Sequence, residues 1–138
     1  MSLEANKAIL ARYFDEFWCK GNADAADGLV HPDIFYHQMP EGLPQGIDGI
    51  KALVGAWRQG FPDMHETVEM VIAEGDRAMG RFRLRGTHGG DFFGIAATGR
   101  PVEITGIDVL RIADGKIAEI WTNEDTYDLY RQIGVIEG

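Results

Sequence analysis

The spacing of apolar residues changes once along this chain, near Gly60, and the change determines the class of fold. Before it, residues 5–20 and 47–60 carry apolar side chains at helical spacing, and residues 23–30 predict a short helix between them. After it the spacing has a period of 2, which is typical of strands. Helices followed by strands favour an α+β fold over alternating βαβ units.

Four long antiparallel strands are expected in the second half of the chain. Residues 64–76 and 77–86 predict a hairpin, and residues 102–128 contain two further strands joined by an Ala-Asp-Gly turn. In residues 77–86 apolar and glycine positions alternate with mostly basic ones, which predicts one buried face and one exposed face, a candidate subunit contact. Residues 31–39 predict a short strand, and residues 126–135 predict a closing helix.

A loop with four glycines, residues 87–101, separates the two hairpins. Loops of this length in compact domains are usually functional or mobile. We expect a curved antiparallel sheet wrapped around the N-terminal helices, with a pocket at its open end.

The length of 138 residues fits one domain, residues 1–138. Residues 1–3 and 137–138 are interpreted as remnants of expression cloning. The net charge of −9 argues against a nucleic acid or an anionic membrane as partner. Cys19 is the only cysteine, and the sequence shows neither a signal peptide nor a membrane-spanning run, so a cytoplasmic protein is expected.

Two aspartates lie in the otherwise apolar hairpin of residues 102–128, and they are the first candidates for chemistry. A carboxylate in a buried strand is unfavourable unless it is paired, hydrogen-bonded or protonated. For Asp108 the alternative is a salt bridge to Arg111 or to a residue of a neighbouring strand, and such a partner would keep it ionised. For Asp125 the alternative is an N-cap of the closing helix. Trp121, Asn123 and Asp125 share a strand parity and are expected to point together.

The sequence resembles the SnoaL-like polyketide cyclases, a group also described as predicted ester cyclases. The resemblance rests on NKAILARYFDEFW, on RGTHGGDFFGIAATGRPVEITGIDVLRIADGKIAEIW and on the closing Asp125. It implies a cone-like α+β barrel, the fold of nuclear transport factor two, scytalone dehydratase and ketosteroid isomerase. It also implies a homodimer or higher homo-oligomer and catalysis without a metal or organic cofactor.

The resemblance also suggests roles for the two aspartates. Asp125 matches the aspartate that acts as general acid/base in the aldol ring closure of SnoaL-type cyclases. Asp108, in the segment GIDVLR, resembles the aspartate of ketosteroid isomerase that stays neutral and donates a hydrogen bond to a dienolate oxygen.

Further residues are candidates for contacting a substrate. His37 and His88 titrate near physiological pH, although a solvated loop position is the alternative for His88. The remaining candidates are Tyr13 on the first helix, Trp121 and Asn123 on the last strand, and Phe93 in the glycine loop. The four histidines lack metal-ligand spacing, so no metal site is expected. Ser2 is the only serine, which excludes a serine hydrolase.

The sequence therefore predicts a cofactor-independent enzyme that binds a small hydrophobic carbonyl compound and performs acid/base chemistry. Aldol-type cyclisation and isomerisation fit this description, and hydration and epoxide hydrolysis belong to the same class. The alternative is a non-catalytic module on the same fold that binds a small ligand or another protein. That alternative is favoured if Asp125 caps the helix and the cone holds no cavity.

Overall fold

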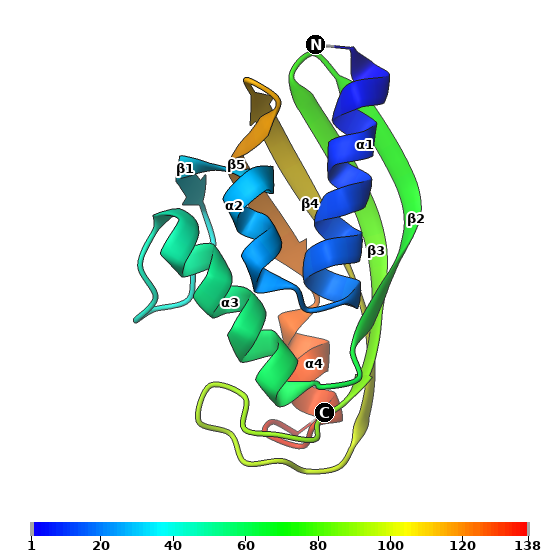
Figure 1. The fold of residues 1–138 in the computed structure, drawn as a ribbon. Helices are drawn as coiled ribbons and strands as arrows, with labels where there is room; N and C mark the ends of the chain where they lie inside the picture. The colour runs from blue at the N-terminus through cyan, green and yellow to red at the C-terminus, as the bar shows by residue number, and fades with distance from the viewer. Residues whose placement is uncertain (1, 138) are drawn as a thin grey trace.

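Helices precede strands along the chain, as the change of period predicts. The computed structural model describes residues 2–137, and Figure 1 shows its elements. The helical first half comprises α1 (Leu3–Tyr13), a π-helical segment η1 (Phe14–Cys19), a 3-10 turn η2 (Ala23–Ala25), α2 (Ala26–Leu29) and, after β1 (Val30–Tyr36), α3 (Gly46–Gly60). The second half comprises β2 (His65–Glu74), β3 (Arg77–Thr87), β4 (Pro101–Ala113), β5 (Lys116–Glu124) and α4 (Thr126–Gln132).

The five strands form one curved sheet in the order β1-β5-β4-β3-β2, and the sheet is not closed into a barrel. The four long strands pair antiparallel as predicted, whereas β1 pairs parallel to β5. Helices α1, α2 and α3 lie on one face of the sheet, and α4 lies near its lower end in Figure 1. The α+β class and the curved sheet against the N-terminal helices are confirmed.

The alternation predicted for β3 is confirmed, since Ala78, Gly80, Phe82 and Leu84 are all buried against the helices. Gly80 pairs with Asp108 on β4. A Cβ atom on Gly80 would lie 2.6 Å from Phe14 Cε2, closer than any real contact. The glycine therefore lets the first helical segment approach the sheet closely at the level of Asp108.

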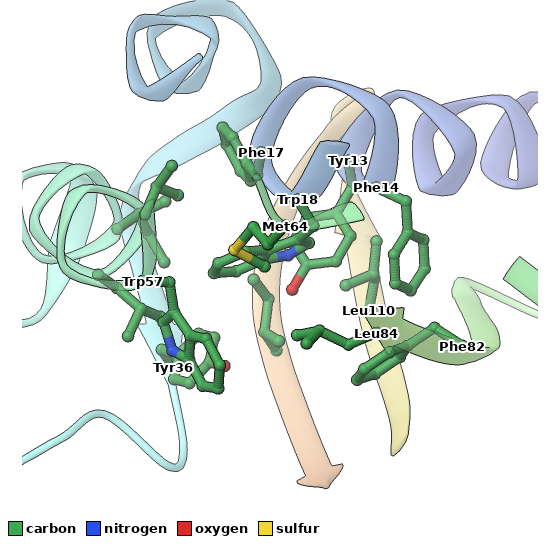
Figure 2. Packing of buried hydrophobic residues seen from close by; sticks show 14 of the residues in the cluster. Tyr13, Phe14, Phe17, Trp18, Tyr36, Trp57, Met64, Phe82, Leu84 and Leu110 are labelled. Carbon is green, nitrogen blue, oxygen red and sulfur yellow. The ribbon is translucent and has the colours of Figure 1, made fainter. Parts of the chain in front are cut away.

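The first helix differs from the prediction for residues 5–20. The α-helix ends at Tyr13 and continues as the π-helical segment η1 before Gly21, which has a φ of +68°. The two consecutive segments, α1 and η1, together bury an aromatic cluster against the sheet, which includes Tyr13, Phe14, Phe17 and Trp18 (Figure 2). A π-helical turn rotates the later residues relative to an α-helix, and such turns are frequent at functional sites.

Of the terminal residues interpreted as cloning remnants, Met1 and Gly138 lie outside the described residues. Ser2 caps α1 by accepting a hydrogen bond from the Ala5 N–H at 3.0 Å, and Leu3 begins the helix. Within residues 2–137, the helices lack the length and apolarity that crossing a bilayer requires.

Candidate active site

Two adjoining hollows lie between the helices and the inner face of the sheet. The larger one, called the outer cavity, has a volume of about 470 Å³. The smaller one, called the inner chamber, has a volume of about 10 Å³ and is lined by Trp18, Tyr36, Trp57, Glu66, Phe82, Asp108, Thr122 and Glu124. Four of these residues also line the outer cavity: Tyr36, Trp57, Thr122 and Glu124. The inner chamber is therefore the deep end of the outer cavity.

Aromatic side chains form much of the wall of the outer cavity. Tyr36 from β1 and Trp57 from α3 lie close together in Figure 2. Trp57 also contacts Phe92 of the glycine loop, with ring centroids 4.8 Å apart. Phe93, a predicted contact residue, lines the same cavity and has a left-handed backbone with φ of +48°. Such a cavity suits a hydrophobic ligand of small size.

Asp108 lies at the inner chamber, and only 3% of it is exposed. Its Oδ2 accepts a hydrogen bond from the Tyr13 hydroxyl at 2.7 Å. Burial raises the pKa of Asp108 to about 6, although the hydroxyls of Thr122 and Tyr13 counteract it by favouring the ionised form. The alternative of a salt bridge to Arg111 is wrong, because Arg111 donates to Glu119 at 2.9 Å on the other face.

Two further carboxyl groups, which the sequence analysis did not select, lie at the same chamber. Burial raises the pKa of Glu66 well above its ordinary value, and the negative charges of Asp108 and Glu124 add to the shift. Burial and the charge of Asp108 raise the pKa of Glu124 to about 8. A signal existed for both: Glu66 shares a strand parity with Met64 and Val68, and Glu124 shares one with Ile120 and Thr122.

The three carboxyl groups consequently differ in protonation near neutral pH. Asp108 is largely ionised at pH 7 and Glu124 is largely protonated, whereas burial shifts the pKa of Glu66 upward, in the same direction as that of Glu124. Titratable groups whose environments separate their pKa values can serve as the base and the acid of one site. The chamber therefore holds an ionised base beside a neutral acid.

Asp125 lies outside the two hollows as the described residues line them. Its side chain is exposed and caps α4 by accepting a hydrogen bond from the Asp128 N–H at 3.1 Å. This is the alternative named for it from the sequence. The second condition for a non-catalytic module is not met, because a cavity is present.

Trp121 and Asn123 do not point together with Asp125 into one site. Trp121 lies on the outer face of β5, where its ring stacks on His37 with centroids 4.7 Å apart. Asn123 lies at the rim of the outer cavity. The even positions of β5, which include Ile120 and Thr122, lie on the inner face, so the odd positions are directed away from the inner chamber, and Asp125 lies beyond the strand as the N-cap of α4.

The two candidate histidines are both placed away from the hollows. The Nε2 of His37 lies 2.5 Å from Glu119 Oε2 on the outer face of the sheet. His88 is fully buried rather than solvated, so that alternative is wrong. Its Nδ1 accepts a hydrogen bond from the Thr98 N–H at 3.3 Å, and its ring packs on Phe61. Among residues 2–137, no group of three or more His, Cys, Asp or Glu side chains could hold a metal ion.

Residues 8–133 match the model of the SnoaL-like polyketide cyclase family, which is most of the chain. The chain belongs to the SnoaL-like polyketide cyclase family. Among proteins of curated function, none matches it.

Solved structures agree with this membership of the SnoaL-like family. TsrD from Streptomyces laurentii is 26% identical, with a TM-score of 0.88, and the match covers 99% of each chain. IdmH from Streptomyces antibioticus, for which a polyketide cyclase role is proposed, is 31% identical with a TM-score of 0.79 over 94% of this chain and 98% of its own. AclR from Streptomyces galilaeus, for which a hydroxylase role is proposed, is 26% identical with a TM-score of 0.85. The match covers 99% of this chain and 85% of the AclR chain.

Proposed function

We propose that this SnoaL-like protein is a cofactor-independent enzyme that binds a small hydrophobic carbonyl compound in the outer cavity and catalyses proton transfer there. The observation that carries the proposal is the pair of Asp108 and Glu124 at the deep end of an aromatic cavity. The pKa of Asp108, about 6, and that of Glu124, about 8, lie on either side of neutrality.

Asp108 acts as the base in this proposal. Removing a proton from the carbon next to a carbonyl group produces an enolate, and an ionised carboxylate can accept that proton. Glu124 is neutral and donates a hydrogen bond to the enolate oxygen, which stabilises the charge that develops there. Tyr13 holds Asp108 in place and stabilises the ionised form of its carboxyl group.

Two reactions follow from one such enolate. In an aldol-type cyclisation its carbon attacks a second carbonyl group of the same molecule, and the alkoxide formed takes a proton. In an isomerisation the abstracted proton returns to a different carbon. In both reactions the product is an isomer of the substrate, so neither reaction needs another reactant.

The experiment is hydrogen–deuterium exchange at the carbon next to the carbonyl group, followed by NMR in D₂O with a panel of small hydrophobic ketones and 1,3-diketones. We expect the protein to accelerate exchange for at least one compound. Asp108→Asn and Glu124→Gln should each slow this exchange by about 10²–10⁴-fold, the usual contribution of a general acid or base. The rate should rise with pH through about 6 and fall again through about 8.

Glu103→Gln is the matched control, because Glu103 is exposed on the outer face and pairs with Arg85. Its exchange rate should equal that of the wild type. If compounds bind in the cavity, as chemical-shift changes would show, but none exchanges faster than in buffer, the protein is instead the non-catalytic binding module.

A further inference from the structure

Three polar atoms of the inner chamber complete no hydrogen bond of good geometry within residues 2–137, although the Thr122 and Tyr13 hydroxyls lie near two of them. The three atoms are Trp18 Nε1, Glu66 Oε1 and Asp108 Oδ1, and all three residues line the chamber. Their residues are 5%, 6% and 3% exposed. An unsatisfied polar atom at such a depth is destabilising by roughly 1–3 kcal/mol, so three of them lining one small chamber favour a shared polar ligand there.

The three atoms are chemically complementary to a single water molecule. The indole N–H of Trp18 can only donate, and an ionised Asp108 can only accept. Burial raises the pKa of Glu66 well above its ordinary value, and in the protonated form this side chain can donate its proton or accept through its carbonyl oxygen. A water molecule can accept a hydrogen bond from the indole and donate one to the carboxylate at the same time. Buried waters typically make about three hydrogen bonds.

The size of the chamber agrees with this occupant. Its volume of about 10 Å³ is close to the least space that holds one water molecule. Phe82 and Trp57 supply apolar parts of the lining, and the small volume leaves no room for a larger polar ligand. A cavity lined only by apolar groups would stay dry, but this one offers the polar partners that a buried water needs.

The π-helical segment η1 places the hydrogen-bond donor, the indole N–H of Trp18, at the inner chamber. Trp18 lies within η1, and its ring packs against Tyr13 and Trp57 with centroid distances of 6.3 and 6.4 Å. Its N–H lies near the Tyr13 hydroxyl without completing a hydrogen bond to it (Figure 2). The Tyr13 hydroxyl donates its proton to Asp108, and the indole N–H, which completes no hydrogen bond to the Tyr13 oxygen, can donate to a further acceptor.

We propose that the inner chamber binds one water molecule, held by Trp18, Glu66 and Asp108, and that Asp108 reaches the substrate through it. This second part rests on the proposed function. A proton leaving the substrate carbon passes to the water oxygen while the water gives one of its own protons to Asp108 Oδ1. The water is thereby regenerated. Trp18 and Glu66 are positioning residues, since they orient the water and do not touch the substrate.

The first test is a high-resolution crystal structure of the ligand-free protein and of two variants. In the wild type we expect an ordered water within hydrogen-bond distance of all three atoms. Trp18→Phe removes the donor, and Glu66→Leu removes the second partner without leaving a buried charge, so each should lose the water. Trp121→Phe and Glu69→Gln are the matched controls, because both side chains lie on the outer face, and they should keep it.

The second test measures the pKa of Asp108 by carboxyl ¹³C NMR in the same proteins. A water that donates to the carboxylate favours the ionised form, so losing it should raise the pKa of Asp108 in Trp18→Phe and in Glu66→Leu. Both controls should leave this pKa unchanged. Glu66→Gln should restore it, because the amide keeps the shape of the side chain and can still bind the water.

Two outcomes would overturn the water site: a direct hydrogen bond between Trp18 Nε1 and the Tyr13 oxygen with no water present, or an unchanged pKa of Asp108 in both variants. These measurements need no substrate, so they are independent of the proposed enzyme activity. An ordered water together with absent hydrogen–deuterium exchange would leave the site standing and reject the catalytic role.

Discussion

Asp108 is held between two opposing influences, and their balance decides what it can do. Burial disfavours its charge, whereas the hydroxyls of Thr122 and Tyr13 stabilise that charge. With a pKa of about 6, the ionised form exceeds the neutral form about tenfold at pH 7. The neutral hydrogen-bond donor that the resemblance to ketosteroid isomerase suggests is therefore the minor form of Asp108 at this pH, and the ionised carboxylate is the major one.

The role of Asp125 can be separated from that of Asp108 by substitution. Asp125→Ala removes the side chain that caps α4 and should lower the free energy of unfolding by about 1 kcal/mol. Asp125→Asn keeps a good cap and should leave stability unchanged. Urea unfolding measures both effects.

The same two variants test the role that the family resemblance implies for Asp125. Because its carboxylate caps the helix and is exposed to solvent, we expect Asp125→Asn to retain nearly full exchange activity. A large loss of activity at unchanged stability would instead support Asp125 as the acid/base residue.

The sequence identified only part of the carboxyl cluster, and the reasons are local. Asp108 was conspicuous because its neighbours on the inner face, Gly106 and Leu110, are not charged. Strand parity alone did not select Glu66, because β2 also carries Glu69 and a bulge between Val68 and Met70 interrupts the alternation of faces between the two glutamates. The sequence does not separate Glu124 from Asp125, because they are adjacent carboxylates at the end of β5 and only the structure shows which of them lines the chamber.

At the scale of elements, local patterns predicted the strands better than the helix ends. A period of 2 assigns a face to every residue of β3 and β4, and these assignments hold. The π-helical segment is different, because an α-turn and a π-turn of residues 14–19 bury similar aromatic side chains. No local signal distinguishes them, so the position of Trp18 at the inner chamber could not be predicted.

Contacts between distant residues explain what else the sequence did not show. His88 is buried because its loop is tied back through the His88 N–H to Arg100 O and the Gly99 N–H to His88 O. The parallel pairing of β1 with β5 joins two segments about 80 residues apart in the chain, and Tyr36 of β1 lines the outer cavity. Neither contact follows from the spacing of residues within one segment.

At the scale of the whole molecule, the outer face of the sheet is a candidate for self-association. It exposes apolar side chains on three strands, namely Phe35, Met70, Ile72 and Ile107. Exposed apolar patches of this kind commonly mark protein contacts. Together with the family resemblance, this leads us to expect a homodimer that forms through this face.

Light scattering after size-exclusion chromatography tests this expectation. Ile72→Glu places a charge in the patch and should shift the protein towards the monomer. Val135→Glu is the control, because Val135 is similarly exposed but lies beyond α4, away from the sheet. A wild-type protein that is monomeric at micromolar concentration would contradict the prediction.

Stability should depend on pH through the carboxyl groups that line the inner chamber. Asp108 and Glu124 have pKa values of about 6 and 8 in the folded chain, against about 4 in the unfolded one. Between these values the folded protein binds more protons than the unfolded protein, so raising the pH favours unfolding. Each group then contributes a slope of at most about 1.4 kcal/mol per pH unit.

The carboxyl groups of the outer face with lowered pKa values, namely Glu69, Glu103 and the half-buried Glu119, have the opposite effect. Their stabilisation is present above about pH 4 and is lost below it, so they do not affect the range from pH 5 to pH 8. We expect the free energy of unfolding, measured by urea titration, to fall steadily across that range. Glu124→Gln should flatten the curve above pH 6, whereas Glu103→Gln should not. A free energy that stays constant from pH 5 to pH 8 would mean that the chamber does not hold its carboxyl groups in the neutral form.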